Sequence, residues 1–450
     1  MAGVTSGLSA GEIGRKAVHM AVGGFAFAVR PLGPVLSVLA ALTAVLFNAF
    51  VLPRIGGRRL WREGEARNGF ALGIVLYPVA VLLLLLIFAR HLEVAAATWG
   101  ILAFGDGMAS IVGMAIGRQK LPWNPAKSWA GSLAFFLFGG LAASILLLWS
   151  APGAYSASFA IAIGFAAALF AALLESQPLG LDDNLGVPLV TGLVLFCLTL
   201  TQGNWQVVTT AEFRSGLLLG LAVNLALALA AYATGGVGRS GAATGILLGT
   251  TIWAFAGGGA FALLFAFFVL GTVATRLGYA RKAAAGIAQE KGGRRGPGNA
   301  LSKTSIPALA AIFAATTGYP QLFALALAGA FATAAFDTVS SEVGKAYGRR
   351  TYLITTLRSV PRGTDGAVSL EGTLSGVAAA ILLAGLGALL DLYPPLGIVA
   401  VVVAATIATT LESWIGATLE KRGLLDNEAV NFLNSLAGAL VAAGAGLLLV

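Results

Sequence analysis

Fifteen apolar segments, most of them long enough to cross a bilayer as a helix, organise the whole sequence. A transmembrane helix needs about 20 apolar residues, and about 17–25 are tolerated. The segments lack the alternating polarity of membrane β-strands, so we expect an all-α, polytopic integral membrane protein with about 15 transmembrane helices. The fourth and twelfth segments are short, and we expect both to extend past their polar ends. The segments are 14–30, 34–52, 71–89, 94–105, 129–149, 157–174, 187–201, 216–234, 242–256, 260–278, 305–318, 321–336, 372–391, 396–414 and 429–449.

Charged residues are scarce and lie almost entirely on one side of the predicted membrane. Of the 450 residues 58% are hydrophobic and only 10% are charged, whereas soluble domains have about 25% charged residues. This composition excludes a soluble enzyme and a disordered chain, and the single cysteine excludes a disulfide-built module. If every segment crosses, 25 of the 28 basic residues fall on the side of the N-terminus. This predicts a cytoplasmic N-terminus and an extracytoplasmic C-terminus. The net charge of +9 then reflects membrane topology, and we expect no nucleic-acid partner.

Two segments share the polar pattern D-x3-S-x-V-G-x3-G-R. Asp106–Arg118 and Asp337–Arg349 align without a gap at an offset of 231 residues, with seven identities in thirteen positions. Shorter matches follow in the same order; they pair Ser128 with Ser369, Glu175 with Glu412, and Asp183 with Asp426. The pattern predicts an old duplication into two parallel repeats of seven spans. We therefore expect a first domain at 1–205, a linking transmembrane helix at 206–240, and a second domain at 241–450.

The polar residues of the first half suggest a nucleotide site at one membrane surface. A carboxylate at the bilayer centre costs roughly 2.5–3.5 kcal/mol, so helix packing alone explains Asp106 poorly. Carboxylates can hold Mg²⁺ while lysine and arginine neutralise phosphate oxygens. Membrane anchoring by the basic residues and solvated loop acids are the structural alternatives. The candidates are Asp106, Glu175 and Asp183 for catalysis, Asp106, Asp182 and Asp183 for Mg²⁺, Ser110, Arg118, Lys127 and Ser128 for nucleotide or phosphate, and Asn184 for polar support.

The first helix carries a polar face of its own. Glu12, Arg15, Lys16 and His19 lie at i, i+3, i+4 and i+7. His19 is either a general base for an alcohol or a buried histidine whose hydrogen bonds are satisfied, and the sequence leaves both interpretations open. Glu12 and Arg15 are candidates for polar support of the same site.

The second half repeats the acidic positions but changes the basic ones. Val368 stands where the first half has Lys127, so other basic and hydroxyl residues would have to bind phosphate there. The candidates are Asp337, Glu412 and Asp426 for catalysis, Asp337 and Asp426 for Mg²⁺, Arg349, Arg358, Arg362, Thr364 and Ser369 for nucleotide or phosphate, and Asn427 and Asn431 for polar support.

These segments resemble two families of membrane enzymes. The first half, about residues 10–200, resembles the phytol kinase and dolichol kinase family of membrane-bound, CTP-using lipid alcohol kinases. The resemblance is carried by Glu12–Met20, Phe104–Ser110, Lys127–Ser132 and Glu175–Asn184. The second half, about residues 215–450, resembles the phytyl-phosphate kinase family, and Glu342 joins the candidates through this resemblance. The segments that carry it are Phe336–Glu342, Pro361–Ser369, Glu412–Thr418 and Asp426–Asn431.

The resemblance implies a fusion of two consecutive kinases that face the cytoplasm. The first half would phosphorylate an isoprenoid alcohol such as phytol, geranylgeraniol or farnesol, and the second would convert the monophosphate to the diphosphate. CTP or another nucleoside triphosphate would be the donor, with Mg²⁺ as cofactor, and CTP is implied by the resemblance alone. The expected partners are the isoprenoid, its phosphate and membrane lipids. A lipid cytidylyltransferase and a non-enzymatic lipid transporter or flippase remain alternative interpretations.

Overall fold

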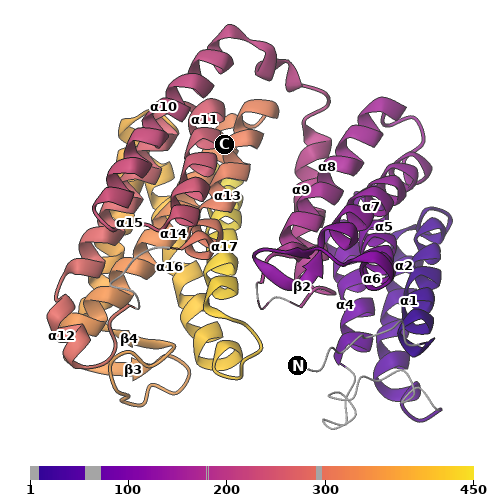
Figure 1. The fold of residues 1–450 in the computed structure, drawn as a ribbon, viewed down its shortest axis with the longest axis horizontal. Coiled ribbons are helices and arrows are strands. Elements are labelled where there is room, and N and C mark those ends of the chain that lie inside the picture. The colour runs from indigo at the N-terminus through magenta and orange to yellow at the C-terminus, as the bar shows by residue number, and fades with distance from the viewer. Residues whose placement is uncertain (1–9, 56–71, 179, 181, 290–295, 450) are drawn as a thin grey trace. The chain divides into compact units, whose positions relative to one another are not determined.

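The chain forms two compact helical units. The computed structural model describes residues 10–55, 72–178, 180, 182–289 and 296–449. The first unit covers Met1–Gln202 and the second covers Gly203–Val450. Among the described residues, helices dominate and the strands form two short antiparallel hairpins, so the all-α prediction is confirmed (Figure 1). The helix expected to link two domains lies within the second unit, where it packs against the helix that follows it.

The first unit is a helical bundle with one hairpin at the end of a long span. α5 (Leu92–Gly100), η4 (Ile101–Asp106) and α6 (Gly107–Ile116) form this span, which extends past its apolar segment as predicted. All three parts pack against α7, and α7 also packs along α8. The other elements are α1 (Ala10–Gly23), η1 (Gly24–Ala28), α2 (Val29–Leu46), η2 (Phe47–Val51), α4 (Leu72–Ile87), β1 (Lys120–Leu121), β2 (Asn124–Ser128), α7 (Trp129–Ser150), α8 (Ala157–Ser176) and α9 (Gly186–Leu200).

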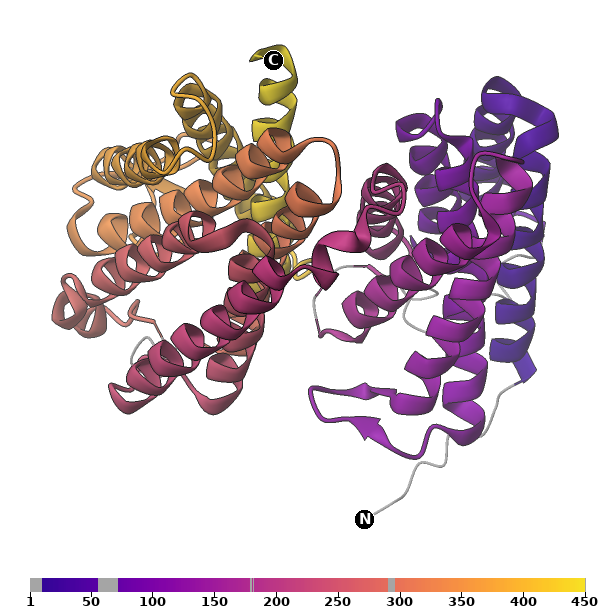
Figure 2. The same ribbon diagram turned by 90° about the horizontal axis from the view of Figure 1, so that it is seen from above.

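The second unit is built around α14 (Pro320–Tyr347), which also extends past its apolar segment as predicted. α14 contacts α11, α13, α15, α16 and α17 in the bundle of the second unit (Figures 1 and 2). Small buried residues of α14 such as Ala328, Gly329 and Ala332 let these helices approach closely. The other elements are η5 (Trp205–Thr209), α10 (Ala211–Ala233), α11 (Arg239–Arg276), α12 (Tyr279–Ala284), α13 (Pro297–Thr316), β3 (Thr351–Leu353), β4 (Ala367–Ser369), α15 (Leu370–Leu389), α16 (Gly397–Ile415), η7 (Gly416–Glu420) and α17 (Asn427–Leu449).

The first 38-residue helical stretch, Gly14–Val51, folds back on itself at a glycine. Gly33 has φ +68°, in the left-handed region that favours glycine because it has no Cβ. Eight residues of straight α-helix would span about 12 Å. However, the Ser37 hydroxyl oxygen lies only 3.4 Å from the carbonyl oxygen of Val29. The stretch therefore consists of two helices joined by a tight turn.

α11 turns in the same way at Gly257, where φ is +75° and the rings of Trp253 and Phe261 are 4.9 Å apart. Both turns fall between segments that the sequence separates into two crossings. By length and composition, ten helical stretches of the described chain can cross a membrane, and two further apolar helices are shorter. The chain is thus an integral membrane protein, and the number of 15 crossings stays a prediction.

Candidate functional site

Asp106 lies in a cluster of charged and aromatic groups in the first unit. It is the last residue of η4, a π-helical turn within the long span, and such turns are frequent at functional sites. Lys16 Nζ donates to Asp106 Oδ2 at 2.6 Å, and His19 Nε2 lies 3.7 Å from the same oxygen. The His19 ring also packs on Tyr77, with 4.2 Å between ring centroids. The face predicted on α1 therefore does reach Asp106.

Lys127 forms ion pairs with Glu175 and Asp183, two further acidic residues that were predicted as site residues. Its Nζ donates to Glu175, which is 5% exposed, and to Asp183 Oδ2 at 2.9 Å. Burial disfavours the charged ammonium, but the attraction of Glu175 and Asp183 outweighs this effect and raises the pKa of Lys127. The lysine therefore stays protonated at neutral pH. Among the described residues, Asp106, Glu175 and Asp183 together line a small cavity of about 10 Å³.

The remaining described candidates of the first unit lie outside the ion pairs around Asp106 and Lys127. Ser128 is buried and accepts a hydrogen bond from Gly131 N at 3.2 Å, which makes it the N-cap of α7. Asp182 is exposed and accepts from the backbone of Asn184 at 2.8 Å. Ser110 and Arg15 are half-buried and Arg118 is exposed. The side chain of Glu12 lies outside the described residues.

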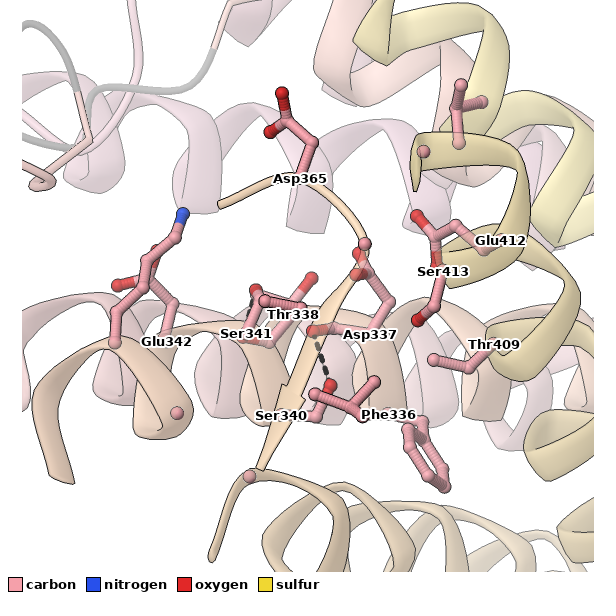
Figure 3. A pocket seen from close by; sticks show the side chains of 18 of the residues that line it. Phe336, Asp337, Thr338, Ser340, Ser341, Glu342, Asp365, Thr409, Glu412 and Ser413 are labelled. Carbon is pink, nitrogen blue, oxygen red and sulfur yellow. Dashed lines mark hydrogen bonds between the residues drawn. The ribbon is translucent and has the colours of Figure 1, made fainter. Parts of the chain in front are cut away.

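The second unit contains an open pocket of about 410 Å³. Asp337, Thr338 and Ser341 line it from α14, Glu412 lines it from α16, and Asp365 lines it from the loop before β4 (Figure 3). Figure 3 shows that Asp337 and Glu412 approach this space from different helices. Two ionised carboxylates that line the same pocket repel each other, and a nearby cation reduces this repulsion.

Lys303 on α13 supplies such a cation to Asp337. Its Nζ donates to Asp337 Oδ2 at 2.7 Å and to Thr338 Oγ1 at 2.9 Å, and its side chain is only 8% exposed. Glu412 accepts instead from the neutral side-chain amide of Asn434. Of these two carboxylates, Asp337 is therefore paired with a lysine and Glu412 meets an uncharged donor.

Glu342 lies at another edge of the same pocket. It is 2% exposed and pairs with Lys282, whose side chain is fully buried and also donates to the carbonyl oxygens of Ala274 and Thr275. All three donors of this ammonium are therefore used within the protein. The pair holds α12 and the end of α11 against α14.

The other second-half candidates divide between the pocket and its surroundings. Thr364, Ser369, Asn427 and Asn431 line the pocket, and Ser369 is also the N-cap of α15 because it accepts from Gly372 N at 3.1 Å. Arg349, Arg358 and Arg362 are exposed and are not among the described residues that line it.

Asp426 has a local structural role at the start of a helix. It accepts a hydrogen bond from Ala429 N at 2.7 Å, the arrangement of a helix N-cap at the start of α17, and it is not among the described lining residues. The catalytic and Mg²⁺ roles of Asp426 therefore stay predictions, whereas Asp337 and Glu412 both line the pocket.

The donor groups of the pocket can be tested against Mg²⁺. Among the described residues, no three carboxylate, histidine or cysteine side chains are grouped closely enough to hold a metal by themselves. Mg²⁺ in nucleotide sites is usually bound by one or two carboxylates together with phosphate oxygens and water. Asp337 and Glu412 supply two carboxylates at one pocket, so the residues present fit a Mg²⁺ that arrives with a nucleotide.

The sequence did not identify the lysines of the second unit as site residues. In the sequence, Lys303 and Lys282 fall in a basic region between two predicted spans, where membrane topology alone explains them, although each side chain is buried. Lys303 lies seven residues into α13, and a charged residue buried within a membrane helix is itself a signal of function. Asp365 and Glu420 also line the pocket and were not predicted.

Comparisons with known proteins agree with this architecture. A family model described as "Integral membrane protein DUF92" matches residues 222–439. The chain is 48% identical over 201 residues to an uncharacterized membrane protein of Synechocystis sp., and this match covers 44% of this chain and 78% of that protein. It is 42% identical over 214 residues to "Protein VTE6, chloroplastic" of Arabidopsis thaliana, covering 46% of this chain and 64% of the relative, slightly less than two thirds.

A third relative carries the name of an enzyme. The chain is 33% identical over 209 residues to "Probable phytol kinase, chloroplastic" of Triticum aestivum, with 42% of this chain and 67% of that protein covered. No solved structure matches the chain. These similarities show that the chain belongs to the DUF92 family of integral membrane proteins.

Proposed function

We propose that the chain is a membrane phosphotransferase that acts on an isoprenoid in two steps, one in each unit. The observation that carries this proposal is the second-unit pocket, where Lys303, Asp337 and Glu412 meet beside hydroxyl groups in a space of about 410 Å³. Relatives named probable phytol kinases support a kinase that acts on an isoprenoid alcohol. The fusion is supported by the family match, which is confined to 222–439, and by relatives that each cover about half of this chain or less.

Phosphoryl transfer depends mainly on positioning and on neutralising charge, and the second pocket offers both. Asp337 and Glu412 would hold Mg²⁺, which supplies charge neutralisation at the transferred phosphoryl group when it is bound. Lys303 stands beside these acids, where its ammonium is placed to neutralise phosphate oxygens. The oxygen of an isoprenyl monophosphate would form the new bond to the γ-phosphorus of the nucleotide. The bond from that phosphorus to the bridging oxygen breaks, and the nucleoside diphosphate leaves.

The first unit would act on the alcohol, which must lose a proton as its oxygen attacks. His19 is the candidate for accepting that proton at Nδ1, because its Nε2 faces two acceptors, Asp106 Oδ2 and the carbonyl oxygen of Leu102, and so carries the hydrogen of the neutral ring. Asp106 and Asp183 are the carboxylates that would hold Mg²⁺ there. Both reactions would take place at the cytoplasmic surface, with the N-terminus inside and the C-terminus outside. The monophosphate could then reach the second unit without leaving the membrane.

The proposal is tested with two variants of the purified chain in lipid nanodiscs. Each is supplied with Mg²⁺, γ-labelled CTP and either phytol or phytyl monophosphate, and the labelled lipids are separated. Asp106→Ala should abolish phosphorylation of the alcohol while added monophosphate is still converted to diphosphate. Asp337→Ala should let the monophosphate accumulate. Glu212→Ala, which removes an exposed acid from α10, is the control and should leave both steps unchanged.

Three results would contradict parts of this proposal. Equal loss of both steps in either aspartate variant would mean a single shared site. Label that appears in pyrophosphate instead of lipid would favour a cytidylyltransferase. Lipid movement across vesicles without nucleotide consumption would favour a transporter or flippase. Replacing CTP with ATP, GTP or UTP in the same assay determines the donor.

A further inference from the structure

Helix α13 presents two different faces to two neighbouring cavities. Asn299 and Lys303, one helical turn apart, line the polar pocket that contains Asp337 and Glu412. Gly296, Ala300 and Thr304, also spaced by one turn each, line a second cavity between α13 and α11. Asn299 lines both cavities, so the two spaces adjoin at this residue.

The second cavity is apolar. It has a volume of about 100 Å³, and Leu248, Leu264, Phe267 and Phe268 from the two arms of α11 form its walls. None of its lining residues, all of which are described, carries a charge. A water molecule occupies roughly 30 Å³ and a methylene group is of similar size, so the cavity holds about three to four such groups. An apolar space of this kind, beside a lysine and an acidic pair, suits the junction of an apolar tail and an anionic head.

We infer that this cavity binds the part of the isoprenoid tail that is closest to the phosphate during the second step. The inference rests on the proposed function and extends it by naming the substrate subsite. The phosphate of the isoprenyl monophosphate lies in the polar pocket near Lys303, and Asn299 stands where head and tail meet. The first carbons of the tail pass between α11 and α13, and the rest of the chain continues into the lipid.

Gly245 makes the subsite testable. It lines the cavity from the first arm of α11, and a Cβ added there would meet nothing within 4 Å. A leucine at this position can therefore extend into the cavity without displacing the backbone. Gly444 on α17 is a matched control, because its added Cβ would also meet nothing within 4 Å, it is exposed, and it does not line either cavity.

The experiment compares Gly245→Leu with Gly444→Leu in nanodiscs, using geranylgeranyl monophosphate and the tailless acceptor methyl phosphate. Gly245→Leu should raise KM for geranylgeranyl monophosphate about ten- to fiftyfold, the effect of losing the burial of about two to three methylene groups. Its KM for the nucleotide and its rate with methyl phosphate should stay within twofold of the unmodified chain. Gly444→Leu should change none of these values. An unchanged KM for geranylgeranyl monophosphate in Gly245→Leu would overturn the inference.

A binding measurement separates this inference from the proposed function. An isoprenyl monophosphate with a diazirine on its first isoprene unit is photolysed with the unmodified chain, and the labelled peptides are identified by mass spectrometry. Label should fall on residues 241–248 or 264–268 and should be lost in Gly245→Leu. Label elsewhere would overturn the subsite even if the enzyme is active. If no acceptor is phosphorylated, the proposed function fails, and the position of the label still decides whether the cavity binds the tail.

Discussion

Each unit pairs an aspartate with a lysine, but the other lysines at the acidic clusters come from different elements in the two units. In each unit an aspartate on a long span accepts a hydrogen bond from a buried or half-buried lysine, at 2.6 Å for Asp106 and 2.7 Å for Asp337. In the first unit the hairpin residue Lys127 also holds Glu175 and Asp183. In the second unit Val368 occupies the corresponding position before the N-cap serine, so no hairpin lysine is present there.

This difference accompanies a large change in free space. Among the described residues, Asp106, Glu175 and Asp183 line a cavity of about 10 Å³, whereas Asp337 and Glu412 line one of about 410 Å³. One ammonium group between two carboxylates can fill the space that a phosphate would otherwise occupy. The two units therefore share an aspartate–lysine pair and differ in whether a hairpin lysine also pairs with the acids.

The largest effect is expected for Lys282→Met in the second unit. Lys282 and Glu342 have side chains that are 0% and 2% exposed, so the change leaves a carboxylate buried without its cation. Removing one partner of a buried pair lowers the free energy of unfolding by about 3–5 kcal/mol. Unfolding in increasing concentrations of SDS measures this loss. Lys127→Met in the first unit should cost less, because the Lys127 side chain is 28% exposed and solvent already screens its charge.

A double variant provides the control for this prediction. Replacing both partners with apolar residues, Lys282→Met with Glu342→Leu, removes the unpaired charge and should restore most of the lost stability. If the double variant is as unstable as Lys282→Met, the loss comes from packing of the lysine chain and the ion pair is not its cause.

The next effect concerns the lysines that pair with the two aspartates. Lys303→Met should lower the rate of the second step on the order of 10²–10³-fold, the usual effect of removing one preorganised charge from a transition state. Lys16→Met should lower the first step and spare the second. Assays with alcohol and with monophosphate measure the two rates separately. A variant that slows both steps equally would show that the two clusters do not act independently.

A smaller effect is expected when a lysine equivalent to Lys127 is introduced into the second unit by Val368→Lys. Val368→Lys places an ammonium at the edge of the open pocket, where it can reach the acids and occupy nucleotide space. We expect KM for the nucleotide to rise about tenfold, equivalent to about 1.4 kcal/mol. Leu370→Lys adds the same charge two residues away at an exposed position and is the control. An unchanged KM in Val368→Lys would show that the hairpin lysine does not determine access.

The sequence predicted the framework of these sites better than their ion pairs. Apolar length predicted an all-helical membrane chain, and the rarity of acids in apolar surroundings singled out Asp106 and Asp337, because both signals are local. Lys303 and Lys282 reach acids that are 34 and 60 residues further along the chain, so their partners depend on how helices pack. The sequence contained the signal for Asp426, since an aspartate directly before a helix is a preferred N-cap.

The smallest effects are expected for the two N-cap serines, and measuring them distinguishes helix capping from phosphate binding. Ser128 and Ser369 were predicted to bind phosphate, yet each accepts a hydrogen bond from the backbone of the glycine three residues later. If capping is their main role, Ser128→Ala and Ser369→Ala should each lower the free energy of unfolding by about 1 kcal/mol and change kcat/KM less than tenfold. SDS unfolding and the two-substrate assay measure both quantities. A loss of kcat/KM beyond tenfold without a loss of stability would instead assign the hydroxyl to the phosphate. Because Ser369 lines the second-unit pocket and Ser128 is not among the described residues that line the cavity at Asp106, any such loss should be confined to Ser369 and the second step.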